Sequence, residues 1–576
     1  MISGLFKKFL KVAWFLPGFL LWASFPPMGE KIDVAFALAP LLWLSRRADA
    51  KTSAKRWFMS GIFFWIATLS WMPAIVKNGG PWPLVVLGWF ALAAYCAAYF
   101  AGYGYLIAKA WAWARQGSYG RRLLTIVLFE PILWCGLELV RSRFLGGFAW
   151  NQLGVVPVNG GFGAPAALGG VYLCSALVIL VNGTIAGIAE RMWKPETSGF
   201  PQIRKFGPIE TLLVFVLVYG VYQLAVGCRQ PTAIDGSRGE RSVKVALVQR
   251  NFPCVFQGRD RQDPYEVYGK LLENVAMLRP DLVVMAESAM CEFGPVDQQG
   301  AVRFAKWASE RCGGASVLAG GTRFGDNLEF NSAGLYSFAT AAASCSESNR
   351  VQSTAIELYD KVHLVPFGEF IPGDKWITAL QKLAPVGSCT PGKLKLLTLG
   401  VSGLETADVR HGLPLGVAIC FEDTDSAQMR QLAKMGARVL FFITNDSWFS
   451  HSNESVQHAW QATARAIETG LPVVRVGNSG VTGTISPDGK ATWLVGANGK
   501  PLVDRSGTMF DRIKVKERGE GEQWNADFHC SPSPSCFTFY TRFGDWPLGV
   551  AFALLILAMI LVKYKAHHEK RRSLSL

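Results

Sequence analysis

The sequence predicts a multi-pass α-helical membrane domain joined to a large water-exposed α/β domain. Half of the 576 residues are hydrophobic, the mean hydropathy is positive at +0.22, and there are 20 tryptophans, a profile typical of membrane proteins. However, 18% of the residues are charged, which is too many for a chain that lies in a membrane throughout. The observations agree only if apolar and polar residues are segregated along the chain, and they are.

Eight apolar stretches are candidates for membrane-spanning helices, because a helix needs about 20 apolar residues to cross the bilayer core. The second stretch is short and is interrupted by Pro40, so it is the weakest of the eight. No A-x-A-like cleavage site follows the first stretch, which favours an uncleaved anchor over a signal peptide. The stretches lie near residues 9–25, 33–45, 57–76, 83–108, 123–140, 166–188, 210–228 and 547–562.

The basic residues indicate which side of the membrane each link occupies. The net charge of +15 would suit a nucleic-acid partner, but Lys and Arg cluster in short links between apolar stretches and in the tail after residue 562. That is the positive-inside pattern of cytoplasmic loops. Eight crossings from a cytoplasmic N-terminus put every basic cluster inside and leave residues from about 230 to 545 outside. The sequence therefore predicts a membrane protein with no nucleic-acid partner.

The domain boundaries follow from the same pattern. The expected parts are N-terminal transmembrane helices at 1–228, a polar linker at 229–242, a catalytic domain at 243–520, a connecting segment at 521–546, a C-terminal transmembrane helix at 547–562 and a basic cytoplasmic tail at 563–576.

Between residues 243 and 520, short β-rich runs alternate with amphipathic stretches, as in an α/β domain. The expected strands are 243–249, 281–286, 316–320, 354–359, 414–421, 438–444, 472–476 and 481–486, and the expected helices are 264–278, 300–311, 425–435 and 455–468.

Twelve cysteines are scattered without C-x-x-C pairs, so the sequence contains no zinc or redox motif, and we expect neither a metal nor a cofactor. Disulfides are permitted outside the cytoplasm. Cys530 and Cys536 are the closest pair in the extracytoplasmic part, and either a bridge or two unbonded thiols would fit.

Three segments of the α/β domain each deliver ionisable residues at the end of a β-rich run. Glu287 lies in the segment DLVVMAESAM. Lys361 and Glu369 lie in ELYDKVHLVPFGEFIP, and Cys420 and Glu422 lie in PLGVAICFEDT. Singly, each has an ordinary explanation, such as an inert core thiol or a solvated charge. Together they match a thiol nucleophile, a carboxylate that takes its proton and an ammonium that stabilises an oxyanion. The acidic stretch after Cys420 predicts a helix start, which would lower the pKa of the thiol.

A Cys–His arrangement is the chief chemical alternative. The domain has five histidines, none in a recognisable protease context, and no H-E-x-x-H spacing occurs. We therefore expect polar surface or loop positions for His363, His411, His451, His458 and His529.

In these contexts Glu287, Lys361 and Cys420 resemble the Glu–Lys–Cys triad of the carbon–nitrogen hydrolase (nitrilase) superfamily. Further segments are similar to one membrane-bound branch, the bacterial apolipoprotein N-acyltransferases, and they cover almost the whole chain. These segments are LSWMPAIVKNGGP (69–81), LELVRSRFLGGFAWNQLG (137–154), KVHLVPFGEFIP (361–372), AICFE (418–422), TNDSWF (444–449), VQHAWQATARAIE (456–468), RVGNSGVTGTISPDG (475–489) and YTRFGDWPL (540–548).

The resemblance implies an α-β-β-α sandwich for the catalytic domain and a role for each site residue. Glu287 would be the general base, Lys361 would stabilise the oxyanion, and Cys420 would be the acylated nucleophile. Two further glutamates, Glu369 and Glu422, would support the site. Three aromatic residues would line the acyl-chain or substrate region: Phe421, Trp448 and Phe449.

The sequence departs from the family pattern at two places near the triad. Met285-Ala286 precede Glu287 where the family usually has Trp-Pro, and Phe421 lacks the aromatic hydroxyl that commonly follows the nucleophile. These departures concern substrate fit and leave the triad intact.

The implied activity is transfer of a fatty acyl group from a membrane phospholipid to the α-amine of the diacylglyceryl-cysteine of lipoproteins. It would proceed through a thioester on Cys420, on the periplasmic side of the bacterial inner membrane. A membrane-anchored nitrilase-type amidase and a non-enzymatic scaffold are the alternatives. The stretch at 146–154, with Trp150, would either help to admit lipid or form an ordinary interfacial loop.

Overall fold

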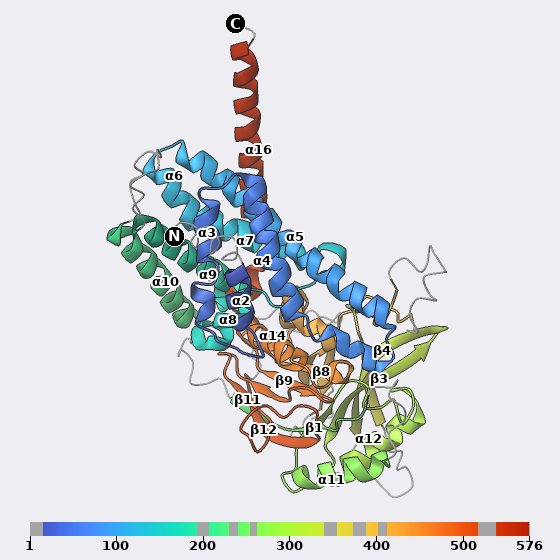
Figure 1. The fold of residues 1–576 in the computed structure, drawn as a ribbon. Helices are drawn as coiled ribbons and strands as arrows, with labels where there is room; N and C mark the ends of the chain where they lie inside the picture. Colours follow the sequence, from blue (N-terminus) through green and yellow to red (C-terminus); the bar gives the residue numbers. More distant parts are fainter. Residues whose placement is uncertain are drawn as a thin grey trace, which may run out of the picture. The chain divides into compact units, whose positions relative to one another are not determined.

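The computed structural model describes residues 15–192, 207–229, 240–253, 262–338, 354–371, 388–400, 412–516 and 537–574. The chain forms two compact units (Figure 1). Unit 1 contains residues 1–70, 86–229 and 542–576, and unit 2 contains residues 71–85 and 230–541. The short segment 71–85 therefore belongs with the α/β part of the chain, although it lies between two apolar helices in the sequence.

Six described helices are long and apolar enough to cross a membrane: residues 50–78, 82–115, 119–141, 166–192, 208–227 and 546–565. Unit 1 is built from α2 (Phe15–Ala23), η1 (Asp33–Ala35), α3 (Ala39–Ser45), α4 (Ala50–Thr68), most of α5 (Trp82–Arg115), α6 (Tyr119–Leu124), η3 (Thr125–Phe129), α7 (Glu130–Arg141), η4 (Phe144–Gly146), α8 (Val155–Pro157), η5 (Val158–Phe162), α9 (Ala166–Met192), α10 (Pro208–Arg229) and α16 (Trp546–Leu574), with α15 (Phe539–Phe543) at its boundary.

The predicted helical membrane part is confirmed, and the chain is a multi-pass membrane protein. The count of eight crossings is not confirmed. The stretch at 33–45 forms only η1 and α3, which are too short to span alone, and the first stretch begins among residues that the structure does not describe.

Buried charges in unit 1 bond to one another and to backbone groups. The Arg46 guanidinium lies 3.5 Å from a carboxylate oxygen of Glu130 and donates to the Gly183 carbonyl at 2.7 Å, and the Trp111 indole N–H donates to Glu130 at 2.9 Å. Because an unpaired charge inside an apolar bundle is costly, these bonds fix how α3, α5, α7 and α9 pack.

Unit 2 contains two six-stranded sheets with matching topology. The first has the order β12-β1-β2-β3-β4-β5 and the second has the order β11-β10-β9-β8-β7-β6. In each sheet three neighbouring strands run parallel, β1-β2-β3 and β7-β8-β9, and the flanking pairs are antiparallel. The strands are β1 (Glu240–Gln249), β2 (Leu282–Met285), β3 (Ser316–Gly325), β4 (Leu328–Phe338), β5 (Thr354–Asp360), β6 (Leu396–Leu399), β7 (Leu413–Ile419), β8 (Val439–Thr444), β9 (Val473–Gly477), β10 (Gly483–Ile485), β11 (Ala491–Trp493) and β12 (Gly507–Lys516).

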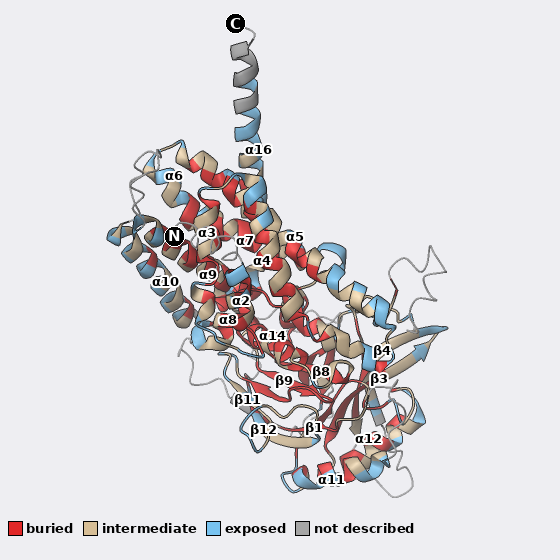
Figure 2. Cartoon of the chain, in the orientation of Figure 1, coloured by how far each residue is buried: buried red, intermediate tan, exposed pale blue. Residues whose placement is uncertain are grey.

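Three apolar clusters define four layers in unit 2. The central cluster joins the facing sides of the two sheets, from Val245 and Val284 on the first to Val417 and Ile443 on the second. The outer face of the first sheet packs against α11 (Pro264–Ala276) and α12 (Gln299–Arg311), and that of the second packs against α13 (Ser426–Met435) and α14 (Glu454–Thr469). Figure 2 shows the strands beneath α14 as almost wholly buried. This is the expected α-β-β-α sandwich.

Candidate active site

The ends of three strands bring together the residues singled out from the sequence. Glu287 follows β2, Lys361 follows β5, and Cys420 follows β7. Gly320 of β3 lies where the two sheets meet: a Cβ at this position would stand 2.7 Å from the Cα of Glu287 and 3.0 Å from Ile443 of β8. A side chain at position 320 would therefore displace the backbone that carries Glu287.

Cys420 occupies a sharp turn between a strand and a helical segment. Its φ of 55° is left-handed, a conformation that costs free energy in a non-glycine residue and is concentrated at functional sites. A 3-10 turn, η10 (Cys420–Thr424), follows at once. The helix expected at 425 begins at Ser426, where the Asp425 side chain accepts from the backbone N–H groups of Ala427 and Gln428.

One amide connects two of the site's carboxylates. The Asn331 side-chain nitrogen, on β4, donates to Glu287 at 2.7 Å and to Glu369 at 2.6 Å. The Lys361 ammonium donates to Glu369 at 2.9 Å, and the Val365 N–H donates to the other Glu369 oxygen at 2.7 Å. Glu287, Glu369 and Lys361 thus form one bonded group, in which Lys361 is 1% exposed and Glu287 is 7% exposed.

The electrostatics place Cys420 in the same group. Burial raises the pKa of the Cys420 thiol well above its ordinary value, the Glu287 carboxylate raises it further, and the Lys361 ammonium opposes both effects. Burial also raises the pKa of Glu287, again against Lys361. Burial lowers the pKa of Lys361, but Glu369, Cys420 and Glu287 outweigh it, so this pKa is raised overall.

The pKa of the Cys420 thiol is therefore raised overall, whereas a helix start was expected to lower it. Desolvation of the thiolate and the charge of the Glu287 carboxylate outweigh the Lys361 ammonium. The raised pKa values favour the neutral thiol of Cys420 and the charged ammonium of Lys361.

Glu422 is fully buried and accepts hydrogen bonds from four different groups. The N–H groups of Val362, His363 and Ile419 donate to it at 2.8, 3.0 and 2.8 Å, and the Tyr359 hydroxyl donates at 3.0 Å. Two of these donors follow Lys361 in the chain, and a third, Ile419, directly precedes Cys420. Glu422 therefore holds these two segments together, and its oxygens are occupied by that task.

A second buried polar cluster lies beside this site, and it corrects the interpretation of His458 as a surface or loop residue. His458 lies on α14, is 1% exposed, and places Nε2 2.9 Å from Asp423 and Nδ1 3.1 Å from Asp446. Arg475 of β9 bonds to both aspartates. Burial lowers the pKa of His458, but Asp423 leads the groups that raise it overall, to about 10. His451, by contrast, is exposed as expected.

Asp446, Glu454 and His458 lie close enough to share a metal ion. The donor set does not favour one, because both His458 nitrogens already face carboxylates and Arg475 already supplies positive charge. The cluster acts instead as an ionic support: Asp423 lies in the turn that starts at Cys420, and Asp446 follows β8.

Two of the aromatic residues expected near substrate lie beside segment 71–85. The Phe449 ring packs edge-on against Trp71 with centroids 4.7 Å apart, and the Asn78 side chain donates to the Trp448 carbonyl at 2.6 Å. Trp71 also donates to Gln457 at 3.2 Å. Phe421 packs edge-on against His363 at 5.9 Å. The roles of Phe421, Trp448 and Phe449 in binding substrate stay predictions.

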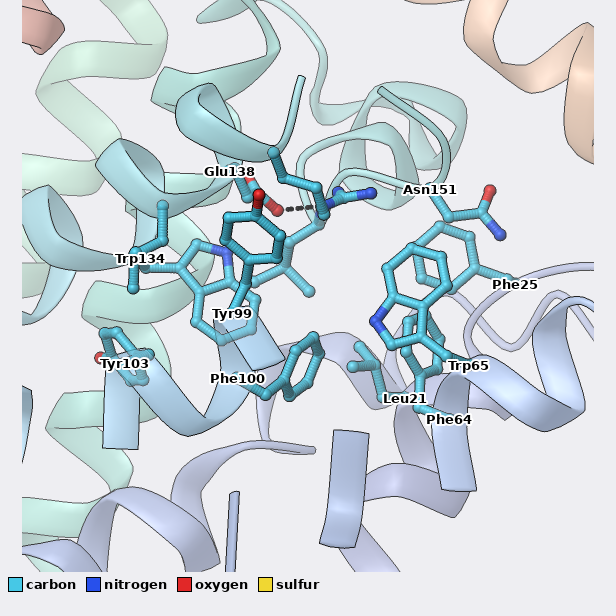
Figure 3. Close-up of a pocket in the computed structure, with 13 residues that line it drawn as sticks. Leu21, Phe25, Phe64, Trp65, Tyr99, Phe100, Tyr103, Trp134, Glu138 and Asn151 are labelled. Carbon is cyan, nitrogen blue, oxygen red and sulfur yellow. Dashed lines mark hydrogen bonds between the residues drawn. The ribbon is translucent and has the colours of Figure 1, made fainter. Parts of the chain in front are cut away.

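Trp150 lies in unit 1, where its ring is 2% exposed. Its loop is held by α7: Arg141 donates to the Phe148 and Trp150 carbonyls at 2.8 and 2.9 Å, and Glu138 accepts from the Leu153 N–H at 2.8 Å. Figure 3 shows Glu138 and Asn151 at an aromatic cavity with Trp65, Trp134 and Phe100. The buried ring does not suit a surface anchor, and a role in admitting lipid stays a prediction.

Four residues named from the sequence, Cys530, Cys536, His411 and His529, lie outside the described residues. Asn331 is a site residue that sequence reasoning missed, because an Asn in a strand carries no signal of a bond to residues 44 positions away.

Comparison with known proteins finds a matching sequence profile for each of two parts of the chain. The sequence profile described as apolipoprotein N-acyltransferase N-terminal domain matches residues 17–184, and the profile described as carbon–nitrogen hydrolase matches residues 340–507. The apolipoprotein N-acyltransferase of Geobacter metallireducens is 28% identical over 571 residues, covering 96% of each chain. That of Photobacterium profundum is 24% identical, covering 94% of this chain and 93% of its own. A solved carbon–nitrogen hydrolase superfamily protein from Xanthomonas campestris covers 47% of this chain and 91% of its own, at 18% identity and a TM-score of 0.32, which is too low to carry an argument.

The fold and the profile matches define a carbon–nitrogen hydrolase domain carried by a multi-pass membrane protein. The chain belongs to the apolipoprotein N-acyltransferase family.

Proposed function

We propose that this protein N-acylates lipoproteins, transferring a fatty acyl group from a membrane phospholipid to the α-amine of an N-terminal diacylglyceryl-cysteine. The family and the names of the relatives support acyl transfer to lipoproteins. The phospholipid donor, the thioester intermediate and the roles of Glu287, Lys361 and Cys420 are our proposals. The observation that carries them is the buried, hydrogen-bonded group of Glu287, Glu369 and Lys361, whose chain Glu422 joins to the residue before Cys420.

In the first half-reaction, Glu287 removes the Cys420 proton and the sulfur attacks an ester carbonyl of the phospholipid. The Lys361 ammonium stabilises the oxyanion of the tetrahedral intermediate. Since Glu369 bonds to Lys361, it keeps the cation in place while negative charge develops nearby. The C–O bond then breaks, the leaving alkoxide takes the proton from Glu287, and lysophospholipid departs from the acyl-enzyme.

In the second half-reaction, the α-amine attacks the thioester and Glu287 accepts the amine's proton. The C–S bond breaks, the leaving thiolate takes the proton back from Glu287, and the N-acyl product leaves, which is ping-pong covalent catalysis. A hydrolase on the same triad would admit water at this stage, so exclusion of water from the acyl-enzyme is what a transferase requires.

We further propose that the protein lies in the bacterial inner membrane with unit 2 on the periplasmic side. The basic residues of the links and of the tail after α16 support this orientation. Both lipid substrates would then meet the site at the outer leaflet.

A membrane-anchored amidase is the second candidate, because the profile that matches residues 340–507 is described as a carbon–nitrogen hydrolase. Two assays of the full-length protein in mixed micelles distinguish an acyltransferase from an amidase. One supplies phospholipid and a diacylglyceryl peptide, and the other supplies short carboxamides and nitriles. If the protein transfers acyl groups, N-acyl peptide and lysophospholipid should form in equal amounts. Both products should be absent with the Cys420→Ala variant, whose thermal stability should equal that of the wild type. Amide or nitrile hydrolysis without N-acyl peptide would contradict it.

A further inference from the structure

A cavity of about 200 Å³ in unit 2 has a polar lining that the triad does not use. Its walls come from four separate parts of the chain. They include Lys77 and Asn78 of η2 (Met72–Asn78), Asn251 after β1, Ser450 and His451 after η11 (Asp446–Phe449), and Asp504 before β12. The volume is below the roughly 300–1,000 Å³ of pockets for drug-sized ligands, so it suits a small polar group better than an acyl chain.

The lining is held in a specific geometry. Asp504 accepts from the His451 backbone N–H at 2.8 Å and lies 3.2 Å from Nδ1 of the same residue, which fixes the imidazole. Asn251, His451 and Asp504 all have left-handed φ angles, of 60°, 61° and 54°. Such conformations cost free energy and are retained where surrounding structure imposes them, commonly at ligand sites.

Chain connectivity places this cavity at the membrane surface. Lys77 lies at the end of the candidate crossing 50–78, in η2, which follows α4 and precedes α5, the next candidate crossing. A link between two consecutive crossings lies at the level of the lipid headgroups. A lysine there meets phosphate groups, for which its ammonium is a suitable ligand.

The cavity is also joined to the catalytic group by bonded segments. Asp446, which acts electrostatically on Cys420, begins η11, and His451 follows five residues later, so at most about 17 Å of chain separates them. Asn78 donates to the Trp448 carbonyl within that stretch. Asn478 donates both to Phe252 in the cavity wall and to Asn445, each bond being 2.8–3.0 Å.

We propose that this cavity binds the phosphate of the phospholipid headgroup, with Lys77 and His451 as ligands, while the ester reaches Cys420. The proposal rests on the proposed function, because it assigns the donor's headgroup to a subsite of the same domain. Asp504 is a positioning residue: it accepts from the His451 backbone N–H and lies beside Nδ1, so that the other edge of the imidazole is left for the phosphate.

The test measures acylation of Cys420 as a function of donor concentration in the full-length protein. Lys77→Gln removes the ammonium, and His451→Asn removes the imidazole while keeping a residue that tolerates a left-handed φ. Lys490→Gln is the matched control, because this exposed lysine lies outside the cavity. Two donors are compared: a phospholipid, and a nitrophenyl ester of the same fatty acid, which has no phosphate.

We expect each cavity variant to raise the phospholipid concentration for half-maximal acylation by about tenfold, the usual effect of losing a hydrogen bond to a charged group. The limiting rate, the nitrophenyl ester reaction and the Lys490→Gln variant should match wild type. Unchanged phospholipid saturation in both cavity variants, or an equal loss with both donors, would overturn the proposal. It would also be overturned if inorganic phosphate bound the cavity while both variants left phospholipid saturation unchanged. Failure of the proposed function would look different: wild type itself would be acylated by the nitrophenyl ester and never by phospholipid.

Discussion

Two opposing influences act on the carboxylate of Glu287, the proposed base. Burial raises its pKa, while the Lys361 ammonium and the Asn331 amide lower it. The Cys420 thiol is harder still to ionise, because burial and Glu287 both disfavour the thiolate. A base beside the thiol is therefore a requirement of this site.

Glu287→Gln should lower the rate of Cys420 acylation by about 10²–10⁴-fold, the usual contribution of a general base. Glutamine keeps the size and the hydrogen-bond acceptor that Asn331 contacts, so the fold should persist. Single-turnover acylation with a nitrophenyl ester measures the effect. A variant that retains more than a tenth of the wild-type rate would remove Glu287 from this role.

Asn331→Leu should move the acid limb of the pH–rate profile to higher pH. The base acts in its ionised form, so the rate falls as pH falls through the Glu287 pKa, which burial already raises. Losing the Asn331 hydrogen bond, which lowers that pKa, raises it further. The profile of kcat/KM against pH records the shift, and a limb that stays in place or moves to lower pH would contradict it.

The sequence predicted the residues of the site better than their surroundings. Glu287, Lys361 and Cys420 stand at strand ends, where α/β domains gather functional groups, and this placement can be read from the pattern. The contacts of Asn331, Asp446 and His458 could not be predicted from the sequence, because each depends on a partner from a distant strand or helix. His458 shows the reason: its helix spacing gave no sign that two aspartates from other elements would enclose it.

Among the elements, the turn that follows β7 owes its shape to buried ionic bonds. Glu422 joins it to the chain after Lys361, and Asp423 joins it to α14 and β9 through His458 and Arg475. These bonds fix the turn from both sides, which suits the proposed role of Cys420 as a preorganised nucleophile.

The His458 cluster should make the stability of unit 2 fall with rising pH. The pKa of His458 is raised from 6.5 to about 10 in the folded protein, so its contribution is complete below pH 6.5 and is lost as pH rises through 10. We expect the thermal midpoint to fall between pH 7 and pH 10. The His458→Gln variant should have a lower thermal midpoint than the wild type at pH 7, and its midpoint should fall less steeply with pH. Parallel plots of midpoint against pH for the two proteins would contradict this.

The elements of unit 2 were largely predictable. Each expected strand and helix coincides with an observed one. Six of the eight strands are the parallel ones, which are apolar runs, and α11–α14 are amphipathic. The pattern missed four strands, β4, β6, β11 and β12. All four lie in the antiparallel flanks of the sheets. β6 and β11 have only four and three residues, and β4 begins with an exposed residue.

For the whole molecule, hydropathy separated the apolar helices from the sandwich. It could not show that residues 71–85 belong to unit 2, because that grouping depends on Trp71 and Asn78 meeting residues almost 400 positions away. The exact number of crossings also depends on packing that composition does not record.

Cys291 offers a native probe of orientation, since it is a free, exposed thiol in unit 2. A membrane-impermeant maleimide added to intact spheroplasts should modify the peptide that carries Cys291, as read by mass spectrometry. Lys565→Cys in the basic tail should react only after the membrane is permeabilised. Modification of Cys291 only after permeabilisation would place unit 2 in the cytoplasm and contradict the proposed topology.

The central claim, that Cys420 carries the acyl group, is tested most directly by mass spectrometry of the purified protein incubated with phospholipid alone. We predict a fatty-acyl adduct on the peptide that contains Cys420, labile to hydroxylamine, transferred to an added diacylglyceryl peptide, and absent from Cys420→Ala. Acyl transfer by the wild type without such an adduct, or an adduct that persists in Cys420→Ala, would contradict it.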